Sequence, residues 1–299
     1  MSPAWKPSAA MIEVRAMRDT MRKMTMGTAL ASAAACGLYA LALRCRRDHP
    51  DWAYLRHWRY AHRGLHNKPV VPENSMAAFR LAADCGFGAE LDVHLMRDGK
   101  LAVIHDSSLL RTAGVDVAVE DLTAEELQQY RLEGTDEHIP LLEEVLALFE
   151  DRAPLVVELK SERGNHDELA AATVAMLDRY RTRYCIESFD PRCLMWLRKN
   201  RPEIVRGQLS EQFLRHEDDG SDLSRGVRFV LGNLLLNFRT EPDFIAYRFE
   251  DRNTPSVFLC RTLYGVQEVN WTIRSREDMA EAERAGNLVI FERIDPNNQ

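Results

Sequence analysis

Two carboxylates that are one residue apart, Glu90 and Asp92, are the residues best suited to chemistry in this sequence. Because successive side chains of a strand point to opposite faces, both carboxylates project from the same face if this segment is extended. Adjacent carboxylates repel each other unless a cation or a proton lies between them, and hard divalent ions prefer oxygen ligands. The pair therefore predicts a site for a divalent cation.

A third carboxylate ends a later apolar run. Glu158 and Lys160 have the same spacing as the first pair, so they share a face of a predicted strand. A charge inside an apolar run such as 155–159 is costly to bury unless it is paired. We therefore expect Glu158 to join the first two carboxylates around one metal ion, either Mg²⁺ or Ca²⁺.

Two histidines complete the set. His62 precedes Arg63, and His105 precedes Asp106. Histidine titrates near neutral pH, so one imidazole can accept a proton while the other donates one. A metal ion, Arg63 and Lys160 can together neutralise an anionic substrate. Such a set of groups describes the metal-assisted cleavage of a phosphate ester.

The order of the motifs along the chain carries more information than any one of them. The sequence contains, in this order, His62-Arg63-Gly64, Pro72-Glu73-Asn74-Ser75, Glu90-Leu91-Asp92-Val93, His105-Asp106, Arg111-Thr112, Asp121-Leu122-Thr123, Ile139-Pro140-Leu141-Leu142-Glu143-Glu144-Val145 and Glu158-Leu159-Lys160. This ordered set resembles that of the glycerophosphodiester phosphodiesterase family, and the resemblance covers residues 58 to 293.

The resemblance implies a (β/α)8 TIM barrel that hydrolyses glycerophosphodiesters to sn-glycerol 3-phosphate and an alcohol. It implies that Glu90, Asp92 and Glu158 hold the divalent ion. It also implies that His62 and His105 are the acid/base pair, and it leaves open whether water or the glycerol hydroxyl attacks first. A lysophospholipid or another lipid phosphodiester is the alternative substrate. A non-catalytic barrel is the alternative of another class, which loss of one of these five residues would favour.

Other site residues follow from the same resemblance. It implies that Arg63 and Lys160 bind the substrate phosphate, with pairing to the carboxylates as the alternative. It places Glu73 and Asn74 beside the site, with helix capping as the alternative. It places Trp271 in the pocket wall, with core packing as the alternative.

The sequence departs from the family near its end. The family pattern is Trp-Thr-Val-Asn followed by Gly-Ile-Ile-Thr-Asp, whereas this chain has Trp271-Thr272-Ile273-Arg274 and then 287–292, Asn-Leu-Val-Ile-Phe-Glu. The reaction is therefore better defined than the substrate. We expect His66 to be solvated and His94 not to be a metal ligand.

Strand and helix signals alternate along the chain, as in parallel α/β folds. Ser75 or Asn74 can cap a helix that ends near Asp84, and Thr123 can form a capping box with Glu126. The motifs above follow predicted strands directly. Because barrel enzymes place their chemistry at the carboxyl ends of their strands, the expected elements agree with the expected site.

Length and charge limit the alternatives. The chain has 299 residues and a net charge of -7, so it fits one barrel of about 250 residues and lacks the basic balance of a nucleic-acid-binding protein. Its six cysteines have no metal-ligand spacing. Buried free thiols favour a reducing, cytoplasmic compartment for the barrel.

An uncharged stretch near the N-terminus, 25–43, is long enough to cross a membrane as a helix. A cleaved signal peptide and an alanine-rich soluble helix are the alternatives. We predict four segments, namely an N-terminal flank (1–23), a single-pass transmembrane anchor (24–43), a juxtamembrane linker (44–57) and the barrel domain (58–299). Aromatic residues of the linker, Trp52 among them, are expected either at the lipid interface or against the barrel.

Overall fold

The computed structural model describes residues 9–216 and 223–294. The contacts within the chain divide it into two compact units, Met1–Ala42 and Leu43–Gln299. Residues 1–8 of the expected flank and 295–299 of the expected barrel domain lie outside the described residues. The two units are described separately below.

The second unit is a closed barrel. In its described residues, eight strands pair in parallel, and the last pairs with the first. They are β1 (Tyr60–Ala61), β2 (Gly88–Leu95), β4 (Leu155–Leu159), β5 (Tyr184–Ser188), β6 (Arg206–Ser210), β7 (Phe244–Arg248), β8 (Gln267–Ile273) and β9 (Leu288–Phe291). A short strand, β3 (Leu101–Val103), pairs antiparallel with β2 and leads to His105. The predicted (β/α)8 barrel is confirmed.

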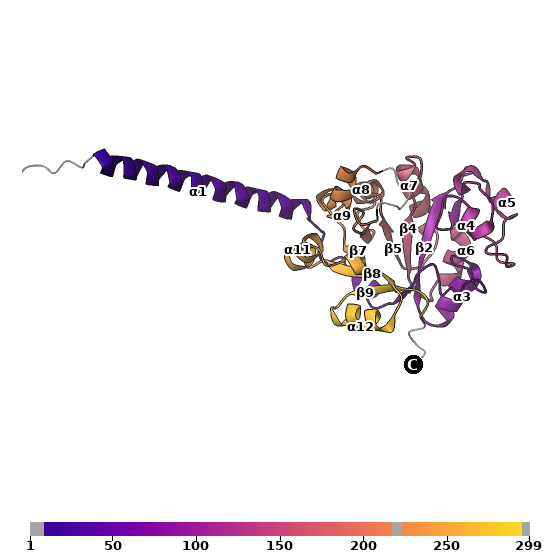
Figure 1. Ribbon diagram of the computed structural model, residues 1–299. Coiled ribbons are helices and arrows are strands. Elements are labelled where there is room, and N and C mark those ends of the chain that lie inside the picture. Colours follow the sequence, from indigo (N-terminus) through magenta and orange to yellow (C-terminus); the bar gives the residue numbers. More distant parts are fainter. Residues whose placement is uncertain (1–8, 217–222, 295–299) are drawn as a thin grey trace, which may run out of the picture. The chain divides into compact units, whose positions relative to one another are not determined.

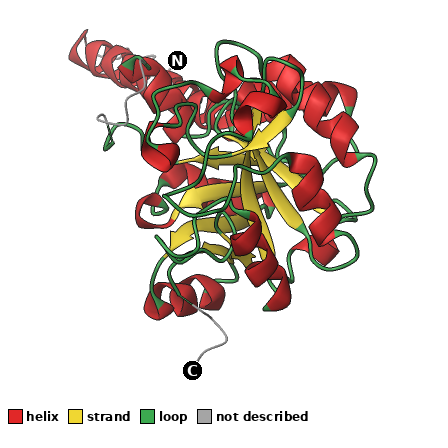
Figure 2. Ribbon diagram, turned by 90° about the vertical axis from the view of Figure 1, so that its right-hand side faces the viewer, coloured by secondary structure: helices red, strands yellow, loops and turns green. Residues whose placement is uncertain are grey.

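Helices surround the strands, which gather at the centre (Figure 1, Figure 2). The helices of this unit are α2 (Trp52–Leu55), α3 (Met76–Asp84), α4 (Leu110–Ala113), α5 (Ala124–Leu127), α6 (Leu142–Phe149), α7 (His166–Leu177), α8 (Pro191–Asn200), α9 (Arg225–Gly232), α10 (Asn237–Thr240), α11 (Pro255–Tyr264) and α12 (Arg276–Arg284), with 3₁₀ turns at Val119–Asp121 and Phe249–Asp251. The expected caps form, because Ser75 accepts from the backbone of Ala78 and Thr123 forms a capping box with Glu126.

Alternation along the strands separates two apolar layers. Leu91 and Val157 belong to the outer core between strands and helices, together with Phe79 and Phe149. Val156 belongs instead to the inner core of the barrel. Because neighbouring side chains point to opposite faces, the carboxylates beside Leu91 and Val157 must point into the barrel. Period-two patterning thus positions the acidic residues.

The chain enters the barrel unit along one end of the strands. Arg46 donates its backbone N–H to Pro242 at 3.0 Å and pairs with Asp243, just before β7. His49 Nε2 lies 2.8 Å from the carbonyl oxygen of Glu203, before β6. Trp52 stacks on Phe244, with centroids 4.8 Å apart. Residues 43–52 therefore line the N-terminal ends of the strands.

The first unit is a single long helix in its described residues. This helix, α1 (Ala9–Ala42), has 34 residues. Its part Met21–Ala42 is long and apolar enough to cross a membrane, and no part of that window is buried within the structure. A signal sequence near an N-terminus has the same properties, so the helix supports the prediction of a membrane segment only by length and composition.

Candidate active site

Three carboxylates converge inside the barrel at the carboxyl ends of two neighbouring strands. Asp92 of β2 is in register with Glu158 of β4, and Glu90 precedes Asp92 on the same face. One oxygen of each carboxylate lies within 4.8 Å of the others. The three residues expose 6% of their surface or less. The structure brings together the three residues that the spacing selected.

A fourth carboxylate, Glu187, lies beside them and was missed by the sequence analysis. It lies one residue before the end of β5, in register with Glu158, and exposes 1% of its surface. Burial and the neighbouring charges of Glu158 and Asp92 raise its pKa well above the usual range. A sequence signal for Glu187 was available. In β4 and in β5, an acidic residue follows two apolar residues near the end of the strand.

The protonation of the cluster reflects crowded negative charge. Burial and the nearby charge of Asp92 raise the pKa of Glu90 well above its ordinary value. Burial also raises the pKa of Glu158, to about 7, against the attraction of Lys160. Burial opposes the ionisation of Asp92 as well, but Lys160, His105 and Arg63 hold its pKa well below the usual range.

The donor set fits a hard divalent metal ion. All donors are carboxylate oxygens. Among the described residues, Glu187 Oε2 is buried without a hydrogen-bond donor, and Asp92 Oδ1 has only its ion pair with Lys160 at 3.1 Å. A buried carboxylate oxygen without a donor is costly, and a divalent cation between the oxygens removes both this cost and the mutual repulsion. The acidic cluster can therefore hold a metal ion.

Two cations flank the cluster. Lys160 Nζ lies 2.8 Å from Glu158 Oε1 and 3.1 Å from Asp92 Oδ1. Arg63 Nε lies 3.3 Å from Asp92 Oδ2, and its backbone N–H donates to Glu90 at 3.0 Å. In this structure both cations pair with the carboxylates, which was the alternative considered for them.

Glu73 fixes the arginine side of the site. It accepts from Arg63 at 2.9 Å and from Arg111 at 2.6 Å, and it pairs with Lys68. Although burial opposes ionisation, the hydrogen bond from Arg111 and the charge of Arg63 lower the pKa of Glu73 to about 2. Asn74, at φ 52°, donates to Asp92 Oδ2 at 2.8 Å. Both residues of the expected turn thus contact site residues.

His62 is held by a residue that the sequence analysis did not select. Its Nδ1 lies 2.8 Å from Glu292 Oε2, and its Nε2 lies 3.8 Å from Glu90 Oε2. Burial and the charge of Arg63 lower the pKa of His62 to about 4, although Glu292 opposes this. A neutral imidazole that donates from Nδ1 to Glu292 keeps Nε2 as an acceptor facing the cluster.

The surroundings of Glu292 correct a second expectation. His66 was expected to be solvated, but it is buried, with Nε2 3.6 Å from Glu292 Oε2. Arg274 Nε donates to the other oxygen of Glu292 at 2.6 Å. Arg274 and Glu292 both belong to the segments in which the sequence departs from the family pattern. The sequence therefore differs from the family at the residue that contacts His62 and at the residue that contacts Glu292.

His105 is oriented from two sides. Its Nδ1 lies 2.5 Å from Asp106 Oδ1, and Asp106 accepts from Arg111 at 2.5 Å. His94 Nε2 lies 3.1 Å from the carbonyl oxygen of His105, while its Nδ1 lies 2.6 Å from Glu120. Burial and Lys160 lower the pKa of His105.

Trp271 lies at the carboxyl end of β8, against Phe189. The two rings meet edge to face, with centroids 5.6 Å apart. Trp271 is half-buried beside the inner core, and its Nε1 is buried without a partner among the described residues. Trp271 therefore packs on the core, which was the alternative considered for it, and its place in the pocket wall stays a prediction.

A (β/α)8 barrel with buried carboxylates, two histidines and two cations at the carboxyl ends of its strands has the architecture of a phosphodiester hydrolase. Comparison with known proteins makes this specific. The chain belongs to the glycerophosphoryl diester phosphodiesterase family, whose model matches residues 62–294.

Relatives and solved structures agree. A glycerophosphodiester phosphodiesterase of Bacillus altitudinis is 35% identical over 174 residues, which are 53% of this chain and 69% of that protein. A rat lysophospholipase D is 40% identical over 101 residues, 29% of this chain and 32% of that protein. The glycerophosphodiester phosphodiesterase structure from Thermotoga maritima is 26% identical, has a TM-score of 0.59, and is matched over 78% of this chain and 92% of its own.

An Oleispira antarctica phosphodiesterase, solved in complex with the product sn-glycerol-3-phosphate, shares the fold. It has a TM-score of 0.66 and 23% identity, over 83% of this chain and 95% of its own. The family, the relatives and the barrel together make this protein a glycerophosphodiester phosphodiesterase.

Proposed function

We propose that the acidic cluster is the catalytic centre, at which glycerophosphodiesters are hydrolysed to sn-glycerol 3-phosphate and an alcohol. The observation that supports this is the convergence of three buried carboxylates with two histidines and two cations at one end of the barrel. Glu90, Asp92 and Glu158 would hold one divalent ion, Mg²⁺ or Ca²⁺. When bound, that ion neutralises charge on the phosphodiester.

The two histidines transfer the protons. His62 is neutral, and Glu292 holds its Nδ1, so its Nε2 is free to accept a proton. His105 has its Nδ1 on Asp106, which leaves Nε2 for the other transfer. A carboxylate behind each imidazole stabilises the positive charge that forms when the ring is protonated.

The two cations bind the phosphate. Lys160 and Arg63 contact the carboxylates from two sides and supply positive charge beside the proposed metal position. Arg63 is held by Glu73, so its guanidinium loses little freedom when substrate binds. Trp271 forms part of the wall that meets the alcohol or the glycerol group.

The substrate class follows from where the chain enters the barrel. Residues 46–52 contact the N-terminal ends of β6 and β7, whereas His62 and Glu292 follow the carboxyl ends of β1 and β9. The proposed site therefore opens at the end of the barrel opposite the chain entry. Because the proposed anchor joins the barrel at the entry end, this arrangement favours water-soluble glycerophosphodiesters over lipids held in the membrane. Similarity to lysophospholipase D of rat favours the second candidate, hydrolysis of lysophospholipids.

We also propose that Met21–Ala42 anchors the protein in a membrane as a single span, with the barrel on the cytoplasmic side. The support is the length and apolar composition of the helix and the free cysteines of the barrel unit.

Product analysis tests the proposal. The protein is incubated with glycerophosphocholine, glycerophosphoethanolamine and lysophosphatidylcholine, each with and without chelator. We expect sn-glycerol 3-phosphate from the first two substrates, and no product in chelator. Lysophosphatidate from the third substrate alone would establish the second candidate, and no product from any substrate at millimolar metal would favour a non-catalytic barrel.

A further inference from the structure

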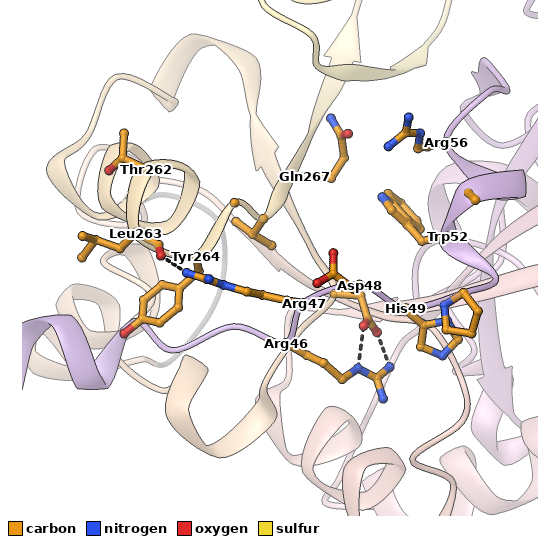
Figure 3. A pocket seen from close by; sticks show the side chains of 15 residues that line it. Arg46, Arg47, Asp48, His49, Trp52, Arg56, Thr262, Leu263, Tyr264 and Gln267 are labelled. Carbon is orange, nitrogen blue, oxygen red and sulfur yellow. Dashed lines mark hydrogen bonds and ion pairs between the residues drawn. The ribbon is translucent and has the colours of Figure 1, made fainter.

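A large cavity lies at the end of the barrel remote from the catalytic cluster. It has a volume of about 620 Å³ and is lined by two segments, the chain entry from Arg46 to Arg56 and the end of α11 with the start of β8, 262–267 (Figure 3). Asp243, before β7, closes one side. All of these residues belong to the barrel unit, and none takes part in the proposed reaction.

The lining is positively charged on balance. Arg46 is neutralised by Asp243, to which it donates from Nε and Nη2. Arg47 donates to the carbonyl oxygen of Leu263 and lies 5.8 Å from the ring centroid of Tyr264. No carboxylate of the described residues pairs with it. In the described chain, Arg56 is exposed and has no ion pair. One further acid, Asp48, also lines the cavity.

The cavity also offers an unused neutral donor. Trp52 stacks on Phe244, and its Nε1 is buried without a hydrogen-bond partner among the described residues. A buried indole N–H normally finds an acceptor. Figure 3 shows Trp52, Arg56 and Gln267 grouped on one side of the cavity. Such a lining suits a phosphate ester that carries an organic group, because the cationic donors can bind the phosphate and the aromatic rings can contact the organic group.

The sequence connects this cavity to the candidate membrane segment. Arg46 follows Ala42, the last residue of that segment, by four residues. An extended chain spans at most about 3.6 Å per residue, so the two Cα atoms lie within about 14 Å of each other. If 21–42 crosses a membrane, Arg46 of the cavity lining is therefore tethered within about 14 Å of the end of the span.

We propose that this cavity binds the headgroup of an anionic phospholipid, with Arg56 and Trp52 Nε1 donating from one side of the cavity and Arg47 supplying positive charge from the side of Tyr264. The proposal rests on the membrane anchoring proposed above and is independent of the hydrolysis. A lipid fits better than free phosphate, because the cavity is several times larger than a phosphate ion and has aromatic walls. Arginine also recognises phosphate with more than one donor.

The test uses full-length protein, delipidated in a mild detergent and titrated with phosphatidylglycerol or phosphatidylcholine of equal chain length, with bound lipid counted by native mass spectrometry. We expect tighter binding of phosphatidylglycerol. An arginine near an anionic lipid contributes about fivefold in affinity, so R47Q/R56Q should weaken phosphatidylglycerol binding by about tenfold or more and leave phosphatidylcholine binding unchanged.

A matched control is available on another face. Arg80 of α3 is exposed, and Arg131 donates to the carbonyl oxygens of Gln128 and Tyr130 as Arg47 does to that of Leu263. The variant R80Q/R131Q changes the net charge equally and should bind both lipids as the parent does. W52F keeps the stacked ring and removes the N–H, so it should weaken phosphatidylglycerol binding by a smaller factor.

Three outcomes overturn the proposal. They are equal binding of the two lipids by the parent protein, an equal loss in R47Q/R56Q and R80Q/R131Q, and displacement of phosphatidylglycerol by millimolar inorganic phosphate. Glycerophosphocholine hydrolysis is measured on the same samples and should be unchanged in R47Q/R56Q. Absence of hydrolysis in the parent would count against the proposed reaction without affecting the lipid result.

Discussion

Glu292 controls the state of His62 at the scale of single residues. It accepts from His62 at one oxygen and from Arg274 at the other, so it fixes both the tautomer and the direction of the ring. We predict that E292Q lowers kcat for glycerophosphocholine by about 10-fold to 100-fold with little change in KM. Steady-state kinetics at saturating metal measures this. A KM effect without a kcat effect would place Glu292 in substrate binding instead.

The two histidines provide the most direct test of the proposed chemistry. We predict that H62A and H105A each lower kcat by about 100-fold or more, as expected for general acid/base groups. The substrate must have an unactivated alcohol, because a good leaving group hides the loss of an acid. H138A is the control, since His138 contacts Glu144 at 3.2 Å and lies outside the cluster. Near-parental kcat in either variant would exclude that histidine from proton transfer.

The metal prediction depends on the oxygen-only donor set. Dialysis against chelator should abolish turnover, and Mg²⁺ or Ca²⁺ should restore it. E158Q removes one charge with almost no change in volume, so we predict that it weakens metal binding by about 10-fold or more, measured by calorimetry. Full activity after exhaustive chelation would show that the carboxylates serve another purpose.

At the scale of elements, residues 43–52 act as part of the barrel. Leu43 and Cys45 are buried, and Arg46 pairs with Asp243. We predict that a protein shortened to 51–299 is about 3 kcal/mol less stable to urea than one shortened to 43–299, because it loses a buried leucine and the ion pair of Asp243 with Arg46. Equal midpoints in urea would show that this segment adds no stability.

The division of the chain follows from these contacts. The sequence alone predicts a linker over 44–57 and a barrel domain that begins at 58. We propose that the folded domain begins at Leu43, because the contacts of the chain change at that residue and Trp52 stacks on Phe244. Of the two locations considered for Trp52, the structure shows the one against the barrel.

At the scale of the whole molecule, the anchor and the catalytic end are separable. Full-length protein should stay with membranes after an alkaline carbonate wash, and residues 43–299 should be soluble with an unchanged kcat/KM for glycerophosphocholine, because a (β/α)8 core closes on itself. Fractionation and kinetics on both proteins measure this. Release of the full-length protein by the wash would mean that Met21–Ala42 does not span.

Local chemistry determined a large part of this protein. The alternation of Glu90 and Asp92 around Leu91 put both carboxylates on one face, since strand geometry fixes that relation within three residues. Ser75 and Thr123 capped helices for an equally local reason. The regular order of strand and helix signals predicted the barrel, because parallel strands need helical crossovers between them.

Only the tertiary structure decided which distant residues complete the site. Closing the barrel places β9 beside β1, and Glu292 thereby reaches His62 across 230 positions of sequence. The same closure buries His66, and the register of β5 on β4 places Glu187 against Glu158. No periodic pattern contains such pairings, because periodicity records neighbours within one element, whereas these contacts depend on how whole elements pair in space.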